Sequence, residues 1–190
     1  MNLEPNKGTY ALIFQANQAF SCKVGRRGNF VGDSGSYIYV GSAFGPGGVY
    51  TRISHHLKLS SNPHWHLDYI RPYLKPVAVC YSYCLKQHEH RWATTIGNID
   101  GVKTPMHKFG ASDCTCRSHL FYFPKISKTS ILQQALQNTM QRSHKLHVTN
   151  FDAKNIARIL SRWKAENKIY KLTVENRLMV GAPLVKGEIS

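Results

Sequence analysis

The sequence predicts an α+β protein: a small antiparallel sheet of three or slightly more strands, flanked by helices, with a C-terminal helical or winged-helix-like extension. Up to residue 124, short runs rich in aromatic and β-branched residues alternate with turns of Gly, Pro, Asn and Ser, a pattern typical of short strands. Beyond it, glycines and aromatics thin out while Gln, Asn, Lys and Arg increase. We therefore divide the chain into a domain at 7–124 and a basic extension at 125–190.

Three strands are predicted in the first part of the chain. Residues 8–14 are GTYALIF, residues 20–24 form a second β-rich run, and residues 37–40 are YIYV. A turn at residues 25–28 carries two cations, Arg26 and Arg27, and another turn covers residues 33–36. This spacing fits an antiparallel meander.

A helix is predicted directly after the third strand. The glycine-rich turn at residues 45–48 cannot continue a strand, and Val49, Ile53 and Leu57 then fall on one helical stripe. Residues 77–84 predict a strand in which Cys80 and Cys84 are interpreted as packing residues. A helix is expected at 89–96, a loop at 101–116 and a last strand at 119–123.

The extension is expected to hold two helices, at 130–141 and 149–167, and a hairpin formed by 168–174 and 177–180 around Glu175-Asn176. Two helices and a basic hairpin resemble a minimal winged helix, a DNA-binding shape. The alternative is a helical bracket packed on the main domain.

The charge of the chain indicates a polyanionic partner. Lys and Arg number 25 against 10 Asp and Glu, which gives a formal net charge of +15 over 190 residues. Such an excess, interleaved with aromatics, favours nucleic acid, and we expect DNA, duplex or structured. No signal peptide, no apolar run long enough to span a bilayer and an odd number of cysteines predict a cytoplasmic, nucleoid-associated protein with reduced thiols.

A candidate site follows from three residues around the glycine-rich turn. Arg52 and His56 are four residues apart on the first helix, so their side chains reach the same region. Tyr39 lies at the end of the strand that precedes the turn. A guanidinium can hold a phosphate through two parallel hydrogen bonds, and a phenol or an imidazole can move a proton, so this set suits a phosphate diester.

Four blocks in order resemble a known family: GTYALIF, YIYVGSAFGPGG, HWHLDY and SDCTCRSHLFYF. Gly8-Thr9-Tyr10 followed by Tyr39-Val40-Gly41 is similar to the signature of the GIY-YIG nucleases. The blocks, which span about residues 7–123, resemble the uncharacterised branch of that superfamily found alone or fused to endonuclease III-type repair glycosylases. The resemblance implies a three-stranded antiparallel sheet flanked by helices, metal-dependent hydrolysis of DNA phosphodiesters and a link to DNA repair.

Carried over by position, the resemblance implies roles for individual residues. Tyr10 and Tyr39 match the two motif tyrosines, Arg52 the arginine of the first helix, and His56 a position that is His or Tyr in related enzymes. Glu89 matches the metal-binding glutamate, which we expect to hold Mg²⁺ or Mn²⁺. The gap between the tyrosines is longer than usual, which implies an inserted pair of short strands or a basic loop.

Each of these residues also has a structural interpretation. Tyr39 can fill the core, and Glu89 can oppose the dipole of its helix. His64 is a second candidate for proton transfer. Cys114 and Cys116, with His64 and His66, form a candidate zinc site, although a single Cys-x-Cys is a weaker signal than paired Cys-x2-Cys.

The predicted DNA contacts are mostly cations, which supply affinity and salt dependence rather than sequence choice. They are Arg26, Arg27, Lys58, Arg117, Ser118, His119, Lys154, Arg158, Arg162 and Lys164. The function predicted from the sequence is a metal-dependent DNA endonuclease. Two alternatives stay open: a DNA-binding protein of repair or regulation that recognises structure without cutting, and a zinc-stabilised interaction domain.

Overall fold

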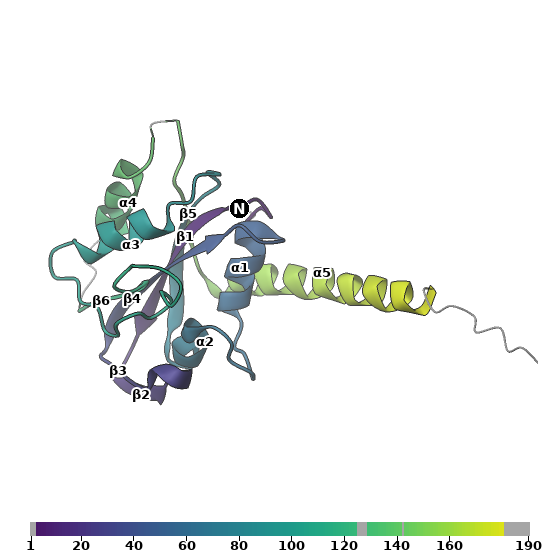
Figure 1. The fold of residues 1–190 in the computed structure, drawn as a ribbon, viewed down its shortest axis with the longest axis horizontal. Coiled ribbons are helices and arrows are strands. Elements are labelled where there is room, and N and C mark those ends of the chain that lie inside the picture. The colour runs from purple at the N-terminus through teal and green to yellow at the C-terminus, as the bar shows by residue number, and fades with distance from the viewer. Residues whose placement is uncertain (1–2, 125–128, 142, 181–190) are drawn as a thin grey trace, which may run out of the picture.

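A computed structural model describes residues 3–124, 129–141 and 143–180, without the side chains of residues 129 and 169–180. The fold is α+β, as the sequence predicts (Figure 1). Its strands are β1 (Gly8–Ala16), β2 (Phe20–Lys23), β3 (Asn29–Gly32), β4 (Gly35–Ala43), β5 (Lys75–Ser82), β6 (Leu120–Phe123) and β7 (His147–Asn150). Its helices are α1 (Gly48–Leu57), α2 (His66–Ile70), α3 (Glu89–Gly97), α4 (Thr129–Asn138) and α5 (Ala153–Val180), with short 3₁₀ turns at Gly25–Arg27 and Arg71–Tyr73.

The main sheet has five antiparallel strands in the order β6-β4-β1-β5-β7. The predicted meander of the first three strands is wrong. β1 pairs directly with β4, and the run at 20–24 instead pairs with β3 in a separate two-stranded sheet. That two-stranded unit is the predicted insertion between the two motif tyrosines, and its strands are joined by the turn that carries Arg26 and Arg27.

The side chains of β1 alternate between two hydrophobic clusters, one on each face of the sheet. Tyr10, Leu12 and Phe14 belong to the cluster covered by α1, α2 and the beginning of α5. Ala11 and Ile13 belong to the other cluster, which α3 and α4 cover (Figure 1). Because the central strand is buried on both faces, it reads as a continuous apolar run rather than as an alternating pattern.

The C-terminal part differs from the predicted winged helix. The helix expected at 130–141 is confirmed as α4, but the residues assigned to a hairpin lie within α5, which is continuous to Val180. The segment between Ala153 and Val180 holds no Gly or Pro, the residues that most strongly interrupt a helix. Gly181 and Pro183 follow it in the sequence.

The region after residue 124 also completes the main sheet. β7 pairs with β5, and Ile159 of α5 is buried in the same cluster as α1. The guanidinium of Arg162 lies 4.2 Å from the ring centre of Tyr50 on α1, and Lys58 Nζ lies 4.6 Å from that of Trp163. Beyond these contacts α5 extends away from the globular body (Figure 1). No helix in the described part of the chain is long and apolar enough to cross a membrane.

Candidate active site

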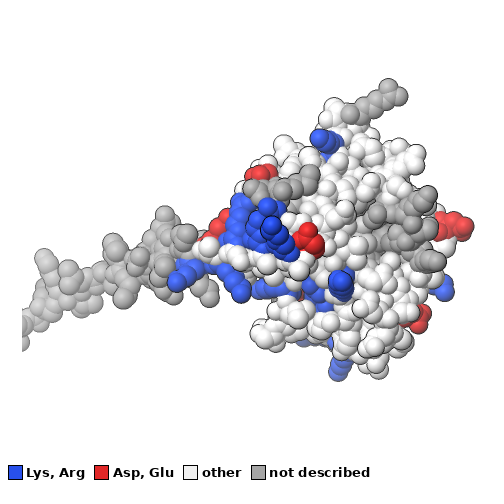
Figure 2. Space-filling model, turned by 180° about the vertical axis from the view of Figure 1, so that it is seen from behind, with Lys and Arg blue, Asp and Glu red and all other residues white. Residues whose placement is uncertain are grey.

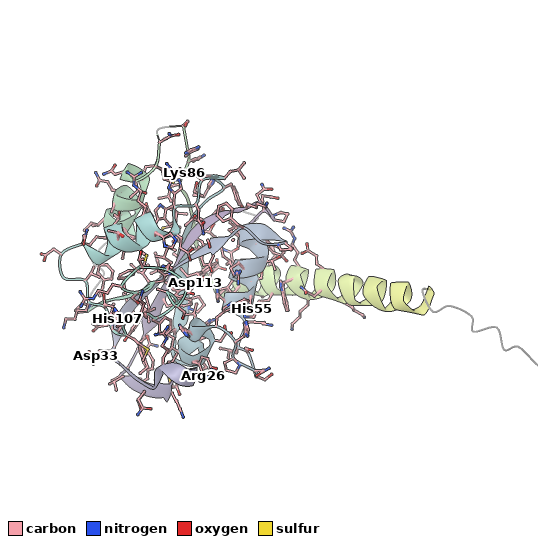
Figure 3. The ribbon with its side chains drawn as sticks, viewed as in Figure 1. Arg26, Asp33, His55, Lys86, His107 and Asp113 are labelled. Atoms are coloured by element: carbon pink, nitrogen blue, oxygen red, sulfur yellow. The ribbon has the colours of Figure 1, made fainter. Side chains whose placement is uncertain are left out.

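A pocket of about 470 Å³ lies where the ends of β1 and β4 meet α1, the segment before α2, the first turn of α3 and the loop before β6. All six residues predicted to be catalytic line it: Tyr10, Tyr39, Arg52, His56, His64 and Glu89. They come from strands, helices and a loop that lie far apart in the sequence. Figure 3 places Asp113, another lining residue, in the middle of the body, with Lys86 and Arg26 toward opposite ends.

A buried tyrosine–histidine pair forms the floor of the pocket. The hydroxyl oxygen of Tyr10 lies 2.9 Å from Nε2 of His56, and both side chains are 2% exposed. The register of the sheet places Gly41 opposite Tyr10. A Cβ at position 41 would lie 2.3 Å from the Tyr10 oxygen, so only glycine leaves room for the phenol to reach His56.

His56 is electrically neutral at physiological pH. Burial lowers the pKa of its imidazole to about 3, and the neighbouring His55 and Arg52 add to this effect against the opposing influence of Asp68. Its Nδ1 is buried without a hydrogen-bond partner among the described residues. The neutral ring of His56 therefore has a nitrogen lone pair that can accept a proton.

The two tyrosines are protonated in the resting protein. Burial raises the pKa of Tyr39 above its ordinary value, the Glu89 carboxylate raises it further, and Arg52 opposes both. The pKa of Tyr10 is also raised well above its usual range, mainly by burial. A tyrosine base needs a lowered pKa, whereas the net effect of the surroundings of Tyr39 is to raise its pKa. Among the three, His56 is the group prepared to accept a proton.

Arg52 is oriented by an aromatic face. Its guanidinium carbon lies 4.6 Å from the ring centre of Trp65, a distance at which a cation is attracted to the π-electrons. The backbone N–H groups of His64 and Trp65 donate to Oδ2 of Asp68 at 3.0 Å. Burial alone would raise the pKa of Asp68, but hydrogen bonds from His55 and from these two N–H groups lower it to about 2. Asp68 thereby fixes the segment that carries Trp65.

Glu89 is the first residue of α3, and its carboxylate faces the pocket. Oε1 lies 3.4 Å from Nδ1 of His119, and Oε2 accepts a hydrogen bond of 3.3 Å from the side chain of Gln87. Burial raises the pKa of Glu89, but hydrogen bonds from His119 and Ser42 outweigh it, so the net pKa is lowered. The Glu89 carboxylate therefore stays ionised in a pocket that Arg52 also lines.

Four Cys and His side chains form a cluster at the rim of the pocket that can hold a metal ion. His90, Cys114, Cys116 and His119 each offer one atom, and these atoms lie within 4.8 Å of one another. His90 Nδ1 is 3.2 Å from the sulfur of Cys116, and His119 Nε2 is 3.5 Å from the sulfur of Cys114.

The prediction that His64 and His66 join these two cysteines is wrong, because His90 and His119 lie next to them instead. Nδ1 of His66 accepts a hydrogen bond from the backbone of Gly110, and His64 lies elsewhere on the lining. His90 was missed because it approaches Cys116 only through the fold. None of the five cysteines of the chain forms a disulfide.

The predicted DNA contacts fall into two groups. The residues of the first group make contacts with other residues of the protein. The hydroxyl of Ser118 is buried and donates to the carbonyl of Leu120, and His119 is 2% exposed between Glu89 and Cys114. Lys58 and Arg162 join α1 to α5, and Arg27 donates to Ser112, a residue that lines the pocket.

The second group faces solvent. It consists of Arg26, Arg117, Lys154, Arg158 and Lys164, all of which are exposed. Figure 2 shows Lys and Arg side chains gathered where α5 leaves the globular body, on the side opposite to that of Figure 1. Exposed cations are therefore present on the first part of α5, at Lys154, Arg158 and Lys164.

A family profile described as "Domain of unknown function DUF123" matches residues 9–144. The chain belongs to the DUF123 family. The matched region extends from β1 past α4, so the DUF123 domain includes every segment that lines the pocket. No curated protein and no solved structure matches the chain.

Proposed function

We propose that this DUF123 domain is a metal-dependent endonuclease that hydrolyses DNA phosphodiester bonds. The observation that carries the proposal is the convergence of a Tyr10–His56 hydrogen bond, an aromatic-oriented Arg52 and an ionised Glu89 in one pocket. The resemblance to GIY-YIG nucleases supports it, because the same residues match that signature. The net charge of +15 supports a polyanionic substrate.

Arg52 binds the substrate in this proposal. Its guanidinium donates to two non-bridging oxygens of the scissile phosphate and offsets the charge that grows on them as water attacks. Trp65 keeps the guanidinium in place. Fixed positioning lowers the cost of reaching the transition state, because the donor does not have to reorganise during the reaction.

Tyr10 and His56 move the proton. As a water oxygen bonds to phosphorus, one of its protons passes to the Tyr10 oxygen, and the phenolic proton passes to Nε2 of His56. The bond from phosphorus to the leaving oxygen breaks, and that oxygen takes a proton from solvent. The incoming phosphate brings negative charge close to His56, which raises the low pKa that burial gives this imidazole.

The donors around Glu89 fit Mg²⁺. Mg²⁺ prefers oxygen ligands, retains several waters and is commonly held by one or two carboxylates together with substrate phosphate oxygens. Glu89 supplies one carboxylate and Asp113 lines the same pocket. A volume of about 470 Å³ leaves room for hydrating waters, each of which occupies about 30 Å³ in the liquid. When bound there, the metal would act as a Lewis acid on the phosphate.

The cluster of His90, Cys114, Cys116 and His119 fits zinc. Zinc bonds of about 2.3 Å to sulfur and about 2.0–2.1 Å to nitrogen place sulfur and nitrogen about 3.6 Å apart in a tetrahedron. The two sulfur–nitrogen distances in the cluster are 3.2 and 3.5 Å. Four protein ligands leave no open position, so this zinc would be structural. It would also orient His119 so that Nδ1–H faces Glu89.

The experiment compares wild type with Glu89→Gln, and with Glu166→Gln as a matched control on the surface of α5. Labelled duplex, nicked, branched and single-stranded DNA are incubated with each protein in Mg²⁺, Mn²⁺ or EDTA. We expect metal-dependent cutting by wild type and Glu166→Gln, loss of cutting in Glu89→Gln, and similar DNA binding by all three. Tight binding without cutting in any metal would favour the non-catalytic alternative. Full activity of Glu89→Gln would refute the metal assignment.

A further inference from the structure

A second group of metal-ligating side chains lies outside the pocket. It consists of Cys84, just after β5, His88, just before α3, and His144, in the turn between α4 and β7. One atom from each lies within 4.8 Å of the others. None of the three lines the pocket, although Gln87 and Glu89 on either side of His88 do. The group therefore lies outside the pocket, but His88 is adjacent in sequence to two residues that line it.

The environment of His88 is unusual for a histidine without a ligand. Its side chain is 2% exposed, and neither ring nitrogen has a hydrogen-bond partner among the described residues. Leaving a buried polar group unpaired costs about 1–3 kcal/mol, so native structures rarely keep one without a reason. A metal ion at the centre of the group would satisfy one of these nitrogens.

The other two side chains already meet. Cys84 is 8% exposed, and its sulfur lies 3.4 and 3.5 Å from the two ring nitrogens of His144. An imidazole binds a metal through one nitrogen, and either distance is close to the separation of about 3.6 Å between a sulfur and that nitrogen in a tetrahedral zinc site. The interpretation of Cys84 as a packing residue is therefore incomplete, because its thiol faces two imidazoles rather than apolar side chains alone.

We propose that Cys84, His88 and His144 bind a second zinc ion, with water at the fourth position. One thiolate and two imidazoles suit zinc better than magnesium or calcium, which prefer oxygen ligands. Binding converts the Cys84 thiol to a zinc-bound thiolate and releases one proton to solvent. The inference does not depend on the nuclease activity, because it uses none of the residues assigned to the reaction.

The ion would fasten the turn after α4 to the segment between β5 and α3. The turn is already braced by Gln137, whose side chain donates to the carbonyl of His144 and accepts from the N–H of Leu146. On the other side, the N–H of His88 donates to the hydroxyl of Thr9 on β1. A zinc ion would join these two braced segments directly, next to the residue that faces the pocket, Glu89.

The first part of the test counts zinc. Zinc per chain is measured by mass spectrometry in wild type, in Cys84→Ser, in His144→Ala and in the double variant Cys114→Ser/Cys116→Ser. We expect one ion for each cluster in wild type. Each of the three variants should lose one of them. Cys22→Ser, which alters a thiol outside both clusters, should keep the wild-type content.

The second part isolates the proposed site. In the Cys114→Ser/Cys116→Ser background, titration with Zn²⁺ against a chromophoric chelator should still show one tight site. His144→Ala in that background should weaken it at least about a hundredfold, because loss of a ligand exceeds the 10–100-fold effect of outer-shell changes. Co²⁺ should give a thiolate-to-metal absorption band that disappears with Cys84→Ser. His144 is partly exposed on a turn, so its removal should leave the fold intact, which circular dichroism checks. A folded double variant that binds no Zn²⁺, or a site unaffected by His144→Ala, would overturn the proposal.

Discussion

The same face of the sheet carries tyrosines at both of its ends, and they are used differently. At one end the hydroxyls of Tyr37 and Tyr122 donate to the backbone carbonyls of Asp33 and Ser34, at 2.8 and 2.9 Å. At the other end the hydroxyl of Tyr10 meets His56, and Tyr39 lines the pocket. Residue type and burial are alike, so the partner of the hydroxyl decides its role. The first end closes a turn, and the second forms the candidate active site.

The largest effect that separates the two ends is expected from Arg52. Arg52→Ala removes the donor proposed to stabilise the phosphate, so single-turnover cleavage should slow about a hundredfold to a thousandfold. Arg26→Ala, which removes an exposed arginine from the two-stranded insertion, should leave the single-turnover rate at saturating protein unchanged. If Arg52→Ala cleaves at the wild-type rate, Arg52 takes no part in the mechanism.

The two tyrosine ends are compared directly by Tyr10→Phe and Tyr37→Phe. Tyr10→Phe breaks the proposed proton path, so cleavage should fall about a hundredfold or more. Tyr37→Phe leaves the carbonyl of Asp33 without its donor and should lower the free energy of unfolding by about 1 kcal/mol, with cleavage unchanged. Denaturant unfolding and single-turnover rates of both variants provide the measurement. Equal loss of cleavage in both would show that the phenol acts only through stability.

The two ends also differ in how they make the stability of the protein depend on pH, because among the described residues only the end that forms the pocket contains a buried neutral histidine, His56. His56 has a pKa of about 3 in the folded state, against about 6.5 when unfolded. Between these values the unfolded state binds more protons, so stability falls as pH falls, by about 1.4 kcal/mol per pH unit from this residue. Above about pH 6.5 the effect vanishes, because His56 is then neutral in both states.

Urea unfolding between about pH 7 and about pH 5 tests this sign. His56→Gln should flatten the pH dependence by about that amount per unit, whereas His107→Gln, at an exposed histidine, should keep the wild-type slope. An unchanged slope in His56→Gln would mean that this imidazole is not buried in its neutral form.

The smallest effect is expected far from the pocket, on α5. Lys154→Ala combined with Lys164→Ala should make the plot of log binding constant against log salt concentration less steep. The slope should change by about two, because each phosphate contact contributes about 0.9. Single-turnover cleavage at saturation should be unchanged. Lys23→Ala combined with Lys75→Ala alters two exposed cations outside that helix and should have less effect. Identical salt slopes for both pairs would show that α5 does not contact the phosphates.

Local sequence patterns predicted most of the helices and strands. In the site they predicted that Arg52 and His56 share one helix, but not that Tyr10 contacts His56. The helix that carries Arg52 and His56 was predictable because a spacing of four residues has a fixed meaning in a helix. The proximity of Tyr10 to His56 was not, since it depends on which strands pair. β1 pairs with β4 across the β2–β3 insertion, and the order of strands in a sheet is not encoded in any single segment.

The same reasoning explains the errors at the C-terminus and at the Cys/His cluster. Glu175-Asn176 suggested a turn, but nothing between Ala153 and Val180 interrupts a helix. β7 was missed because four residues between two helices carry little pattern. His90 was missed because it comes from a different element than Cys114 and Cys116, so no local spacing connects them.

The close packing of Tyr10 against Gly41 links the permitted substitutions at two distant positions. Any side chain at 41 collides with the phenol, so a larger residue there is acceptable only if position 10 has already become smaller. Variants at position 41 should therefore be rescued by small residues at position 10 for folding, but not for proton transfer. In evolutionary terms the two sites are expected to show sign epistasis: each change alone is harmful, and the pair restores a folded but inactive protein.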